Sequence, residues 1–373
     1  MTPLSSKLFG EPLHVWQHAT RESLGIETDK YTVVVGHQPI FFHPGILAKF
    51  IAASEHATSI GGTLVHLVAD HYIGHAGVID MPKMHNGELG VEATELAKVD
   101  ATVSMRDQQP VESSAGAPVF TRYLKETGET NAAMQFAAAT DCLMAPYATV
   151  HHRVAATDLL QSPIGTAIRD HMFANPRVCN TSYNNAVAAY PSSGIPFLPD
   201  DELPLWHGPH NAPVRSHQPD LRPRALLLTL LARLCLGDVF VHGTGGATYD
   251  VVMEHWASQW LGVDVCPSVV ASATLRLPFD IPTIQKARRE YFSGAGSIKQ
   301  SYLDDICSLP RGSAARAIKY SEMHRWLATC GEKPDHKKYC ASRKVARRRD
   351  WAFPLYPRNM LHSMCVTMSR SHV

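Results

Sequence analysis

The hydrophobic pattern of residues 31–68 predicts a strand, a polar loop, a helix and a second strand. Tyr31–Val35 is a short run of apolar and β-branched residues, which is typical of a buried strand. Apolar residues then recur with helical spacing from Ile46 to Phe50, and Pro44 suits the first turn of that helix. Thr63–Val68 is a second apolar run. This order and length predict a right-handed βαβ unit with two parallel strands.

Polar side chains gather where each of these two strands ends. The carboxyl ends of neighbouring parallel strands meet at one edge of a sheet, and ligands of open α/β sheets bind at that edge. An ordinary turn whose histidines cap and pack is the alternative, but two histidines, a glutamine and a lysine surround the first turn. We therefore expect a ligand site made of Gly36, His37, Gln38, His43, Lys49, Asp70, His71 and His75.

A later segment repeats this order of elements. Arg222–Leu236 reads as a buried apolar helix, Val239–His242 as a short strand, and the glycine-rich turn after it leads into a helix that continues to Leu261. The turn fits the dinucleotide motif G-x-G-x-x-G only at its first two glycines, so it predicts an anion-binding turn. Close packing of the helix on the strand is the alternative reason for the glycines. If this strand joins the same sheet, the site gains Gly243, Gly245, Gly246, Tyr249 and Asp250.

The rest of the chain completes an α/β fold with a Rossmann-like parallel sheet. Residues 118–175 read as helices, and Cys266–Leu277 reads as one more strand. Seven prolines in residues 180–220 exclude a regular helix there and indicate an irregular insertion, either a wall over the site or a linker. Beyond about Pro282 the pattern is that of charged, coiled-coil-like helices. We expect a core of residues 1–280 with insertions and a helical appendage of residues 281–373.

Composition narrows the class of protein. The 373 residues are 45% hydrophobic, which is enough for a large core, and the formal net charge of +1 gives no general reason to expect nucleic acid or an anionic membrane as partner. The longest apolar run, near Ala225–Leu236, is interrupted by Arg233 and too short to span a bilayer. Eight cysteines without C-x-x-C pairs, and no signal peptide, favour a cytoplasmic protein with reduced thiols.

The candidate residues suit chemistry on a charged group. Glycine turns at helix starts bind phosphates through backbone N–H groups, and histidines with a lysine can neutralise charge on a transferred phosphoryl or adenylyl group. Asp70 could act as a base or orient an imidazole. Three histidines and this aspartate could instead hold a divalent metal, but no H-x-H or H-x-x-E-H motif supports that, so we assign no metal. Neither a G-x-S-x-G motif nor a P-loop lysine is present.

These residues resemble the bacillithiol biosynthesis cysteine-adding enzymes. The stretch VVVGHQPIFFHPGILAKF and the later ADHYIGH are similar to that family's G-Q-Q-x-G loop, helical lysine and E-D-H-D strand end. On this match the positions that carry over are Gly36, Gln38, Lys49, Asp70 and His71.

The later segment carries the resemblance further. RPRALLLTLLARLCL and VFVHGTGGATYD are similar to the family's R-P, apolar helix, strand and glycine turn, which adds Arg222, Pro223, Gly245 and Tyr249. The resemblance covers about half of the chain and implies a Rossmann-like core, a C-terminal coiled coil and the joining of cysteine to glucosaminyl malate. The resemblance implies a divergent and shorter member of that family, with Ala69, Tyr72 and His37 where the family has glutamate, aspartate and glutamine.

The first functional hypothesis is a cytoplasmic ligase-type enzyme that acts on a small polar metabolite, with ATP or ADP as a candidate cofactor. Its alternatives are a nucleotidyltransferase-like enzyme on another substrate and a non-catalytic ligand-binding or scaffold protein. We expect no membrane or nucleic-acid partner, leave the role of the basic run Arg343–Arg349 open, and consider a homodimer through the C-terminal helices. Catalysis is assigned to His37, His43, Asp70 and His71, and ligand binding to Gly36, Gln38, Lys49, His75, Arg222, Gly243, Gly245, Gly246, Tyr249 and Asp250.

Overall fold

Five parallel strands form the central sheet of a computed structural model, which describes all residues except 1–6, 86–87, 115, 280–297, 330–333 and 371–373. The strand order across the sheet is β12-β11-β3-β4-β7. Chain order thus runs outward from β3 to one edge and then outward from β11 to the other, which is the doubly wound arrangement of Rossmann-like folds. The strands are β3 (Thr32–His37), β4 (Thr63–Val68), β7 (His152–Ala155), β11 (Val239–His242) and β12 (Ser268–Val270).

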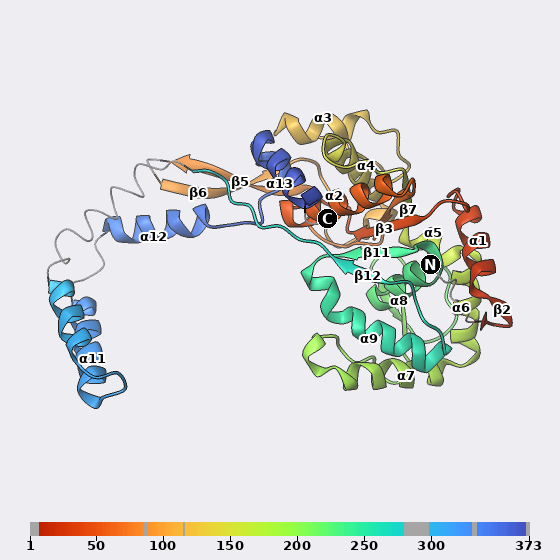
Figure 1. Cartoon of the computed structure of the whole chain (residues 1–373). Helices are drawn as coiled ribbons and strands as arrows, with labels where there is room; N and C mark the ends of the chain where they lie inside the picture. Colours follow the sequence, from red (N-terminus) through yellow and green to blue (C-terminus); the bar gives the residue numbers. More distant parts are fainter. Residues whose placement is uncertain (1–6, 86–87, 115, 280–297, 330–333, 371–373) are drawn as a thin grey trace. The chain divides into compact units, whose positions relative to one another are not determined.

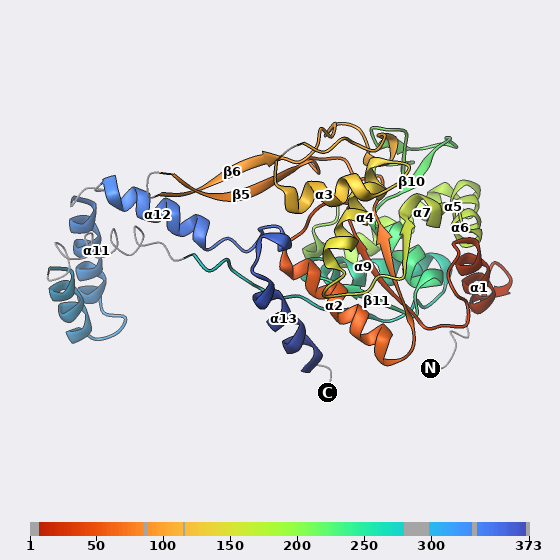
Figure 2. The ribbon, with the colours of Figure 1, turned by 90° about the horizontal axis from the view of Figure 1, so that it is seen from above.

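Helices cover both faces of this sheet, which explains why β4 is buried at every position. On one face lie α2 (Pro44–Ser59), α4 (Ala132–Met144) and α13 (Arg358–Arg370), and on the other lie α1 (Leu13–Ser23), α8 (Ala225–Leu231) and α9 (Thr244–Leu261) (Figure 1, Figure 2). The expected βαβ unit is present, with β3 and β4 parallel and in register from Thr32 and Thr63 onward.

The remaining helices pack mainly on the α8 and α9 side. Trp256 and Trp260 of α9 stack with ring centroids 5.0 Å apart, and Tyr183 meets Trp256 edge-on. The helices that pack on this side are α5 (Ala156–Gln161), α6 (Pro163–Ala174) and α7 (Pro176–Ala189). Helix α3 (Pro118–Glu126) packs on α4 instead. The short helical turns are η1 (Met105–Asp107), η2 (Pro191–Ser193), η3 (Ala232–Leu236) and η4 (Phe353–Leu355).

Three local predictions need correction. Residues 180–220 are not wholly irregular, because α7 continues to Ala189. They also hold β8 (Leu203–His207) and β9 (Ala212–Val214), which form a small antiparallel sheet with β10 (Leu221–Pro223). A register shift in β8 accommodates Pro204 there. The predicted helix over 222–236 begins only at Ala225, because Arg222 pairs with Trp206 in this sheet. The strand expected over 266–277 is limited to β12.

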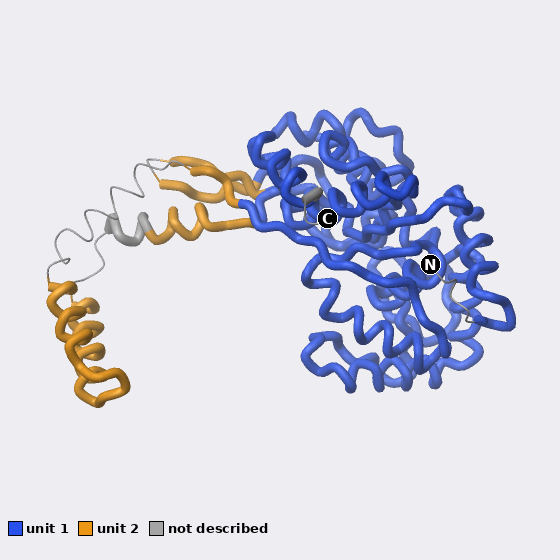
Figure 3. The backbone as a smooth tube through the Cα atoms, in the orientation of Figure 1, with its two compact units in different colours: residues 1–79, 94–275, 350–373 blue, residues 80–93, 276–349 orange. Residues whose placement is uncertain are grey.

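The chain forms two compact units (Figure 3). The first contains residues 1–79, 94–275 and 350–373, and the second contains residues 80–93 and 276–349. The expected boundary near residue 280 lies close to this division, but the units are discontinuous in sequence. The last segment returns to the first unit, where the Phe353 N–H donates to the Phe42 carbonyl over 2.7 Å and the two rings meet.

The second unit is organised around the hairpin of β5 (Val78–His85) and β6 (Glu88–Glu95). It also holds α11 (Ala314–Thr329) and α12 (Pro334–Ala346). Within the basic run, Arg348 pairs with Asp80 over 2.8 Å, so that guanidinium serves an internal contact. The first part of the charged helices expected beyond Pro282, up to residue 297, lies outside the described residues. Across the described part of the chain, no helix is both long enough and apolar enough to cross a membrane.

Candidate functional site

The order of the sheet reverses between β3 and β11, whose carboxyl ends lie side by side. Val33 pairs with Val239 and Val34 with Phe240 in parallel register. The chain leaves β3 toward α2 on one face and leaves β11 toward α9 on the other (Figure 1). In doubly wound sheets this divergence opens the crevice in which ligands bind. The early polar loop and the late glycine turn, about two hundred residues apart, therefore lie at one edge, which fulfils the condition that the sequence analysis set for their meeting.

Lys49 of α2 extends along this edge. Its side chain is buried, and its Nζ donates to the Gly36 carbonyl oxygen over 2.9 Å. A Cβ atom at Gly243 would lie 3.5 Å from Lys49 Cδ, which places the lysine stem against the glycine turn. Burial lowers the pKa of Lys49 to about 8, so the ammonium is charged at pH 7. The ammonium has three N–H donors and one of them binds Gly36, which leaves donors for an anion.

His37 and His43 flank this lysine in different ways. His37 is the last residue of β3, and its Nδ1 lies 2.9 Å from the Gln38 carbonyl, which can only accept. Nδ1 therefore carries the proton and Nε2 is an acceptor. Burial and the charge of Lys49 lower the pKa of His37 to about 3, so its ring is neutral at pH 7. His43 caps α2, because its Nδ1 accepts from the Gly45 N–H over 3.1 Å. The side chain of Gln38 is exposed.

Asp70, from the loop after β4, is held by contacts within the protein. It is 1% exposed, and its carboxylate accepts from the N–H and the hydroxyl of Thr157, which anchors the start of α5. The Arg106 Nε lies 3.6 Å from one carboxylate oxygen, and the His71 Nδ1 lies 3.6 Å from the other. His75 is exposed. The carboxylate that could act as a base or orient an imidazole is thus held by contacts that stabilise the fold.

Arg222 helps to hold the loop after β4 in place. It is fully buried and pairs through Nη2 with Asp107 over 2.8 Å and with Asp220 over 2.7 Å. Its Nη1 donates to Asn211 over 3.3 Å, and the Asn211 amide donates to the His71 carbonyl over 2.8 Å. Arg222 lies on β10, in the small sheet, rather than on a strand of the central sheet. The positive charge of Arg222 is therefore compensated by the carboxylates of Asp107 and Asp220.

The glycine turn after β11 is shorter than expected. Gly243 caps α9, and Gly245 and Gly246 lie inside the first helical turn. A Cβ atom at Gly246 would lie 2.3 Å from His242 Nδ1, whereas one at Gly245 would meet nothing within 4 Å. Glycine is required at position 246 by the close approach of His242, and position 245 is open. Tyr249 packs against the hydrophobic core, so its ring belongs to the core packing and not to the ligand site predicted at this turn.

Asp250 holds the glycine turn in place through a buried network of polar contacts. Its Oδ2 lies 2.7 Å from Arg233 Nη1, 3.2 Å from His242 Nε2 and 2.6 Å from the Ser268 hydroxyl. Burial alone would raise its pKa, but the adjacent His242 ring, the hydrogen bond from Ser268 and the charge of Arg233 outweigh burial and lower the pKa to about 2. Asp250 therefore positions the start of α9 and does not face a ligand as the sequence suggested.

This network contains residues that the sequence reasoning missed. His242, Arg233 and Ser268 come from three separate elements, and only tertiary structure joins them. One signal was available, because Arg233 is a lone charge in an apolar run and a buried charge needs a partner. Thr157 and Arg106, which hold Asp70, gave no such signal. Among the residues that the structure describes, no group of three or more histidine, cysteine, aspartate and glutamate side chains is arranged to hold a metal ion.

The two glycines of α9 provide a matched test of this packing. Gly246→Ala is expected to destabilise the protein by about 1–3 kcal/mol, because the added methyl group overlaps an imidazole that Asp250 holds in place. Gly245→Ala is expected to be neutral or stabilising by up to about 1 kcal/mol, since its methyl group meets open space and alanine favours helix. Urea unfolding measures both. Equal effects of the two substitutions would contradict the close approach of His242 to α9.

Comparison with known proteins adds little to this geometry. No protein-family model matches the chain, and no curated protein matches it. Among solved structures the chain is similar to tryptophanyl-tRNA synthetase from Plasmodium falciparum, with a TM-score of 0.28 and 11% identity over 91% of this chain and 77% of that chain. A similarity this remote supports no statement about activity.

Proposed function

We propose that the chain is a ligase-type enzyme that binds an anionic small metabolite where β3 and β11 diverge. The observation that carries the proposal is the buried Lys49 ammonium, held at the carboxyl edge of the sheet between the Gly36 carbonyl and the Gly243 turn. A buried charge is costly unless it is compensated, and the hydrogen bond that this ammonium makes is to a neutral carbonyl. An anion in the crevice would complete its coordination.

The neighbouring groups suit the same ligand. The start of α9 directs backbone N–H groups and a positive dipole end toward this edge, which favours phosphate or carboxylate. His37 offers Nε2 as an acceptor for a substrate proton, and bound negative charge would raise its low pKa and make it a better base. In this proposal Lys49 holds charge, His37 handles the proton, and Asp70 and Asp250 position the two loops.

The resemblance to the cysteine-adding enzymes supplies the reaction class. It suggests that an amine, such as that of an amino-sugar malate, is joined to the carboxyl group of an amino acid, with ATP or ADP as the candidate nucleotide. Gly36, Gln38 and Lys49 of the shared motif lie at the edge described above, whereas His37 replaces one of its glutamines. This replacement favours the interpretation that the chain is a relative of that family that acts on a different substrate.

Calorimetric titration tests the proposal directly. Wild-type protein is titrated separately with ATP, cysteine and glucosaminyl malate, and with pairs of them. We expect heat of binding from at least one anionic ligand, followed by product formation when the correct set is present. A protein that is folded by circular dichroism but gives no heat with any of the three would contradict ligation.

A non-catalytic binding protein is the second candidate, and one observation favours it. The buried carboxylate of Asp70 is engaged by Thr157 and Arg106, so it is not available to the crevice as a base. The substitution His37→Asn separates the two candidates once a ligand is known. An enzyme loses turnover while its affinity changes little, whereas a binding protein shows only a change of affinity.

A further inference from the structure

Positive charge is concentrated in the second unit of the chain (Figure 3). Residues 80–93 and 276–349 hold 18 lysines and arginines against 10 aspartates and glutamates, a formal net charge of +8. The first unit holds 17 against 24, a formal net charge of −7. The whole-chain charge, which gave no reason to expect a nucleic acid, is thus the sum of two units of opposite sign. Such an asymmetry is typical of a protein of which one part meets a polyanion.

The densest part of this charge lies at the end of α12. Residues 337–349 contain seven lysines and arginines and neither aspartate nor glutamate. Four of these cations are exposed on the last turn of α12 and directly after it, and we call them the basic cluster: Arg343, Lys344, Arg347 and Arg349. The Arg347 N–H donates to the Arg343 carbonyl over 3.1 Å, so these two residues are one helical turn apart and lie on the same side of the helix.

Two contacts fix the basic cluster on its unit. The Ser342 hydroxyl accepts from the Leu89 N–H of β6 over 3.0 Å and is buried, so α12 lies against the hairpin. The Arg276 Nε donates to the Arg347 carbonyl over 3.3 Å, which brings a further exposed cation from another segment to the same place. The cations are therefore presented by a folded surface.

The helix itself accounts for only part of this charge. The carboxyl end of a helix carries a partial negative charge of about half an elementary charge, which a nearby cation compensates. Arg348 pairs with Asp80 of the hairpin over 2.8 Å. The four exposed cations of the basic cluster exceed what the helix end requires, and like charges this close repel one another. A bound polyanion would relieve that repulsion.

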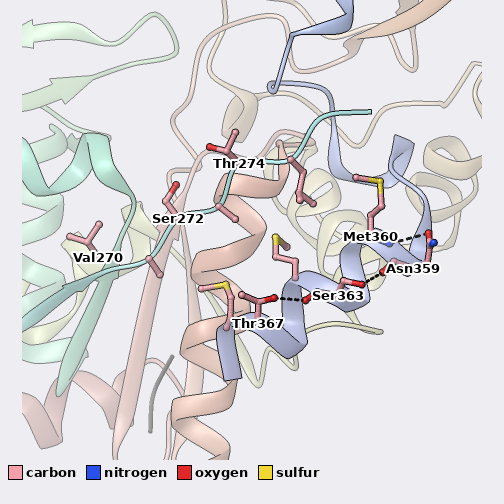
Figure 4. A pocket seen from close by; sticks show the side chains of 12 residues that line it. Val270, Ser272, Thr274, Asn359, Met360, Ser363 and Thr367 are labelled. Atoms are coloured by element: carbon pink, nitrogen blue, oxygen red, sulfur yellow. Dashed lines mark hydrogen bonds between the residues drawn. The ribbon is translucent and has the colours of Figure 1, made fainter. Parts of the chain in front are cut away.

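The groove of the first unit offers no comparable charge. It has a volume of about 700 Å³ and lies between the segment Val270–Leu275 and α13 (Figure 4). None of its lining residues is charged. The Ser363 and Thr367 hydroxyls that line it donate to the Asn359 and Ser363 carbonyls of their own helix, over 2.8 and 2.9 Å. The basic cluster is thus the better match for an extended anion.

We propose that the basic cluster binds the sugar–phosphate backbone of a nucleic acid. Double-stranded nucleic acid presents one negative charge per about 1.7 Å of its axis, so a helix of 13 residues, about 20 Å long, can lie along several phosphates. Three of the four cations are arginines, whose planar guanidinium groups bind phosphate oxygens through two hydrogen bonds. An anionic bilayer is a poorer match, because a helix that lies on a bilayer needs an apolar face, and Val345 is the one aliphatic residue of α12 larger than alanine.

Salt-dependent binding by the full chain tests this proposal. A labelled DNA duplex and a labelled RNA single strand, each about 20 nucleotides long and of mixed sequence, are titrated by fluorescence anisotropy at several salt concentrations. The cluster variant combines Arg343→Gln, Lys344→Gln, Arg347→Gln and Arg349→Gln, and it keeps Arg348 because that residue pairs with Asp80. The control variant removes four exposed cations of the first unit, by Lys7→Gln, Lys98→Gln, Lys125→Gln and Arg177→Gln. Circular dichroism checks that both variants fold.

We expect wild type to bind at least one of the two nucleic acids, with an affinity that falls at least about tenfold between about 50 and 200 mM salt. The cluster variant should bind at least about tenfold more weakly at low salt and with a shallower salt dependence, whereas the control variant should stay within about threefold of wild type. The two nucleic acids distinguish a DNA from an RNA partner.

Four results would overturn the proposal. Wild type that binds neither nucleic acid does so without any variant, and so do equal losses in the cluster and control variants. Binding to phosphatidylserine vesicles but to neither nucleic acid would assign the cluster to a membrane surface. Salt-sensitive self-association in sedimentation, again without nucleic-acid binding, would assign it to the acidic first unit of a second copy. The proposal at Lys49 is independent of these results, because Lys49 lies in the first unit.

Discussion

Replacing Lys49 with methionine is expected to weaken ATP and pyrophosphate binding by about ten- to a hundredfold, the equivalent of about 1.5–3 kcal/mol for a hydrogen bond to a charged group. Methionine keeps the apolar stem that packs against Gly243 and removes only the ammonium. Calorimetry of the two proteins with each ligand measures the difference. Lys98→Met is the matched control, because Lys98 is an exposed lysine of the same unit and its loss removes an equal charge.

The same lysine predicts how affinity depends on pH. Burial lowers the pKa of Lys49 from 10.5 to about 8, so the ammonium is lost as the pH rises through 8 and anion affinity falls several-fold between pH 7 and 9. The loss of the Lys49 charge does not lower the free energy of unfolding. Between pH 8 and 10.5 the unfolded chain binds more protons at this group than the folded chain does, so the lysine contributes increasing stability as the pH rises. Lys49→Met should bind with a flat profile over this range. A loss that is identical in Lys98→Met and Lys49→Met would show that general charge, not this site, holds the ligand.

Asp250→Asn is expected to lower the free energy of unfolding by about 3 kcal/mol or more, because it leaves the buried Arg233 guanidinium without its buried carboxylate partner. Glu254→Gln removes the other carboxylate of the same arginine, 2.7 Å from its Nη2, but that glutamate is 47% exposed. Solvent screens such a pair, so the control should cost under about 1 kcal/mol. Urea unfolding at pH 7 compares the two. Similar losses from both substitutions would argue against Asp250 as the anchor of α9.

Acid unfolding gives a second measurement of this anchor. The pKa of Asp250 is about 2 in the folded protein, against an ordinary value of 3.8, so its contribution to stability is present above about pH 4 and is lost as the pH falls toward 2. The difference in stability between wild type and Asp250→Asn should therefore shrink over that interval. A difference that stays constant down to pH 2 would mean that the negative charge of Asp250 does not stabilise the fold.

Local pattern was sufficient for the central part of the fold. The apolar runs Tyr31–Val35 and Thr63–Val68 predicted buried parallel strands, since side chains packed on both faces of a sheet need no polar alternation. The glycine turn after Val239–His242 likewise predicted a strand followed by a helix start. Because parallel strands place their carboxyl ends at one edge, the two loops meet if the later strand joins the same sheet, and the tertiary structure decided that it does.

What each polar side chain does at that edge was decided by tertiary structure. Asp70 and Asp250 read as equal candidates to face a ligand, yet each is buried against partners from distant segments, Thr157 in one case and Arg233 in the other. A carboxylate is stabilised by whichever donors fold against it, and chain order does not specify those donors. Lys49 differs because, in the described part of the chain, its ammonium donates to a carbonyl rather than to a carboxylate. The sequence placed charged groups at this edge, and packing determined that the two aspartates are bound by donors from distant segments whereas the lysine ammonium is held by a backbone carbonyl.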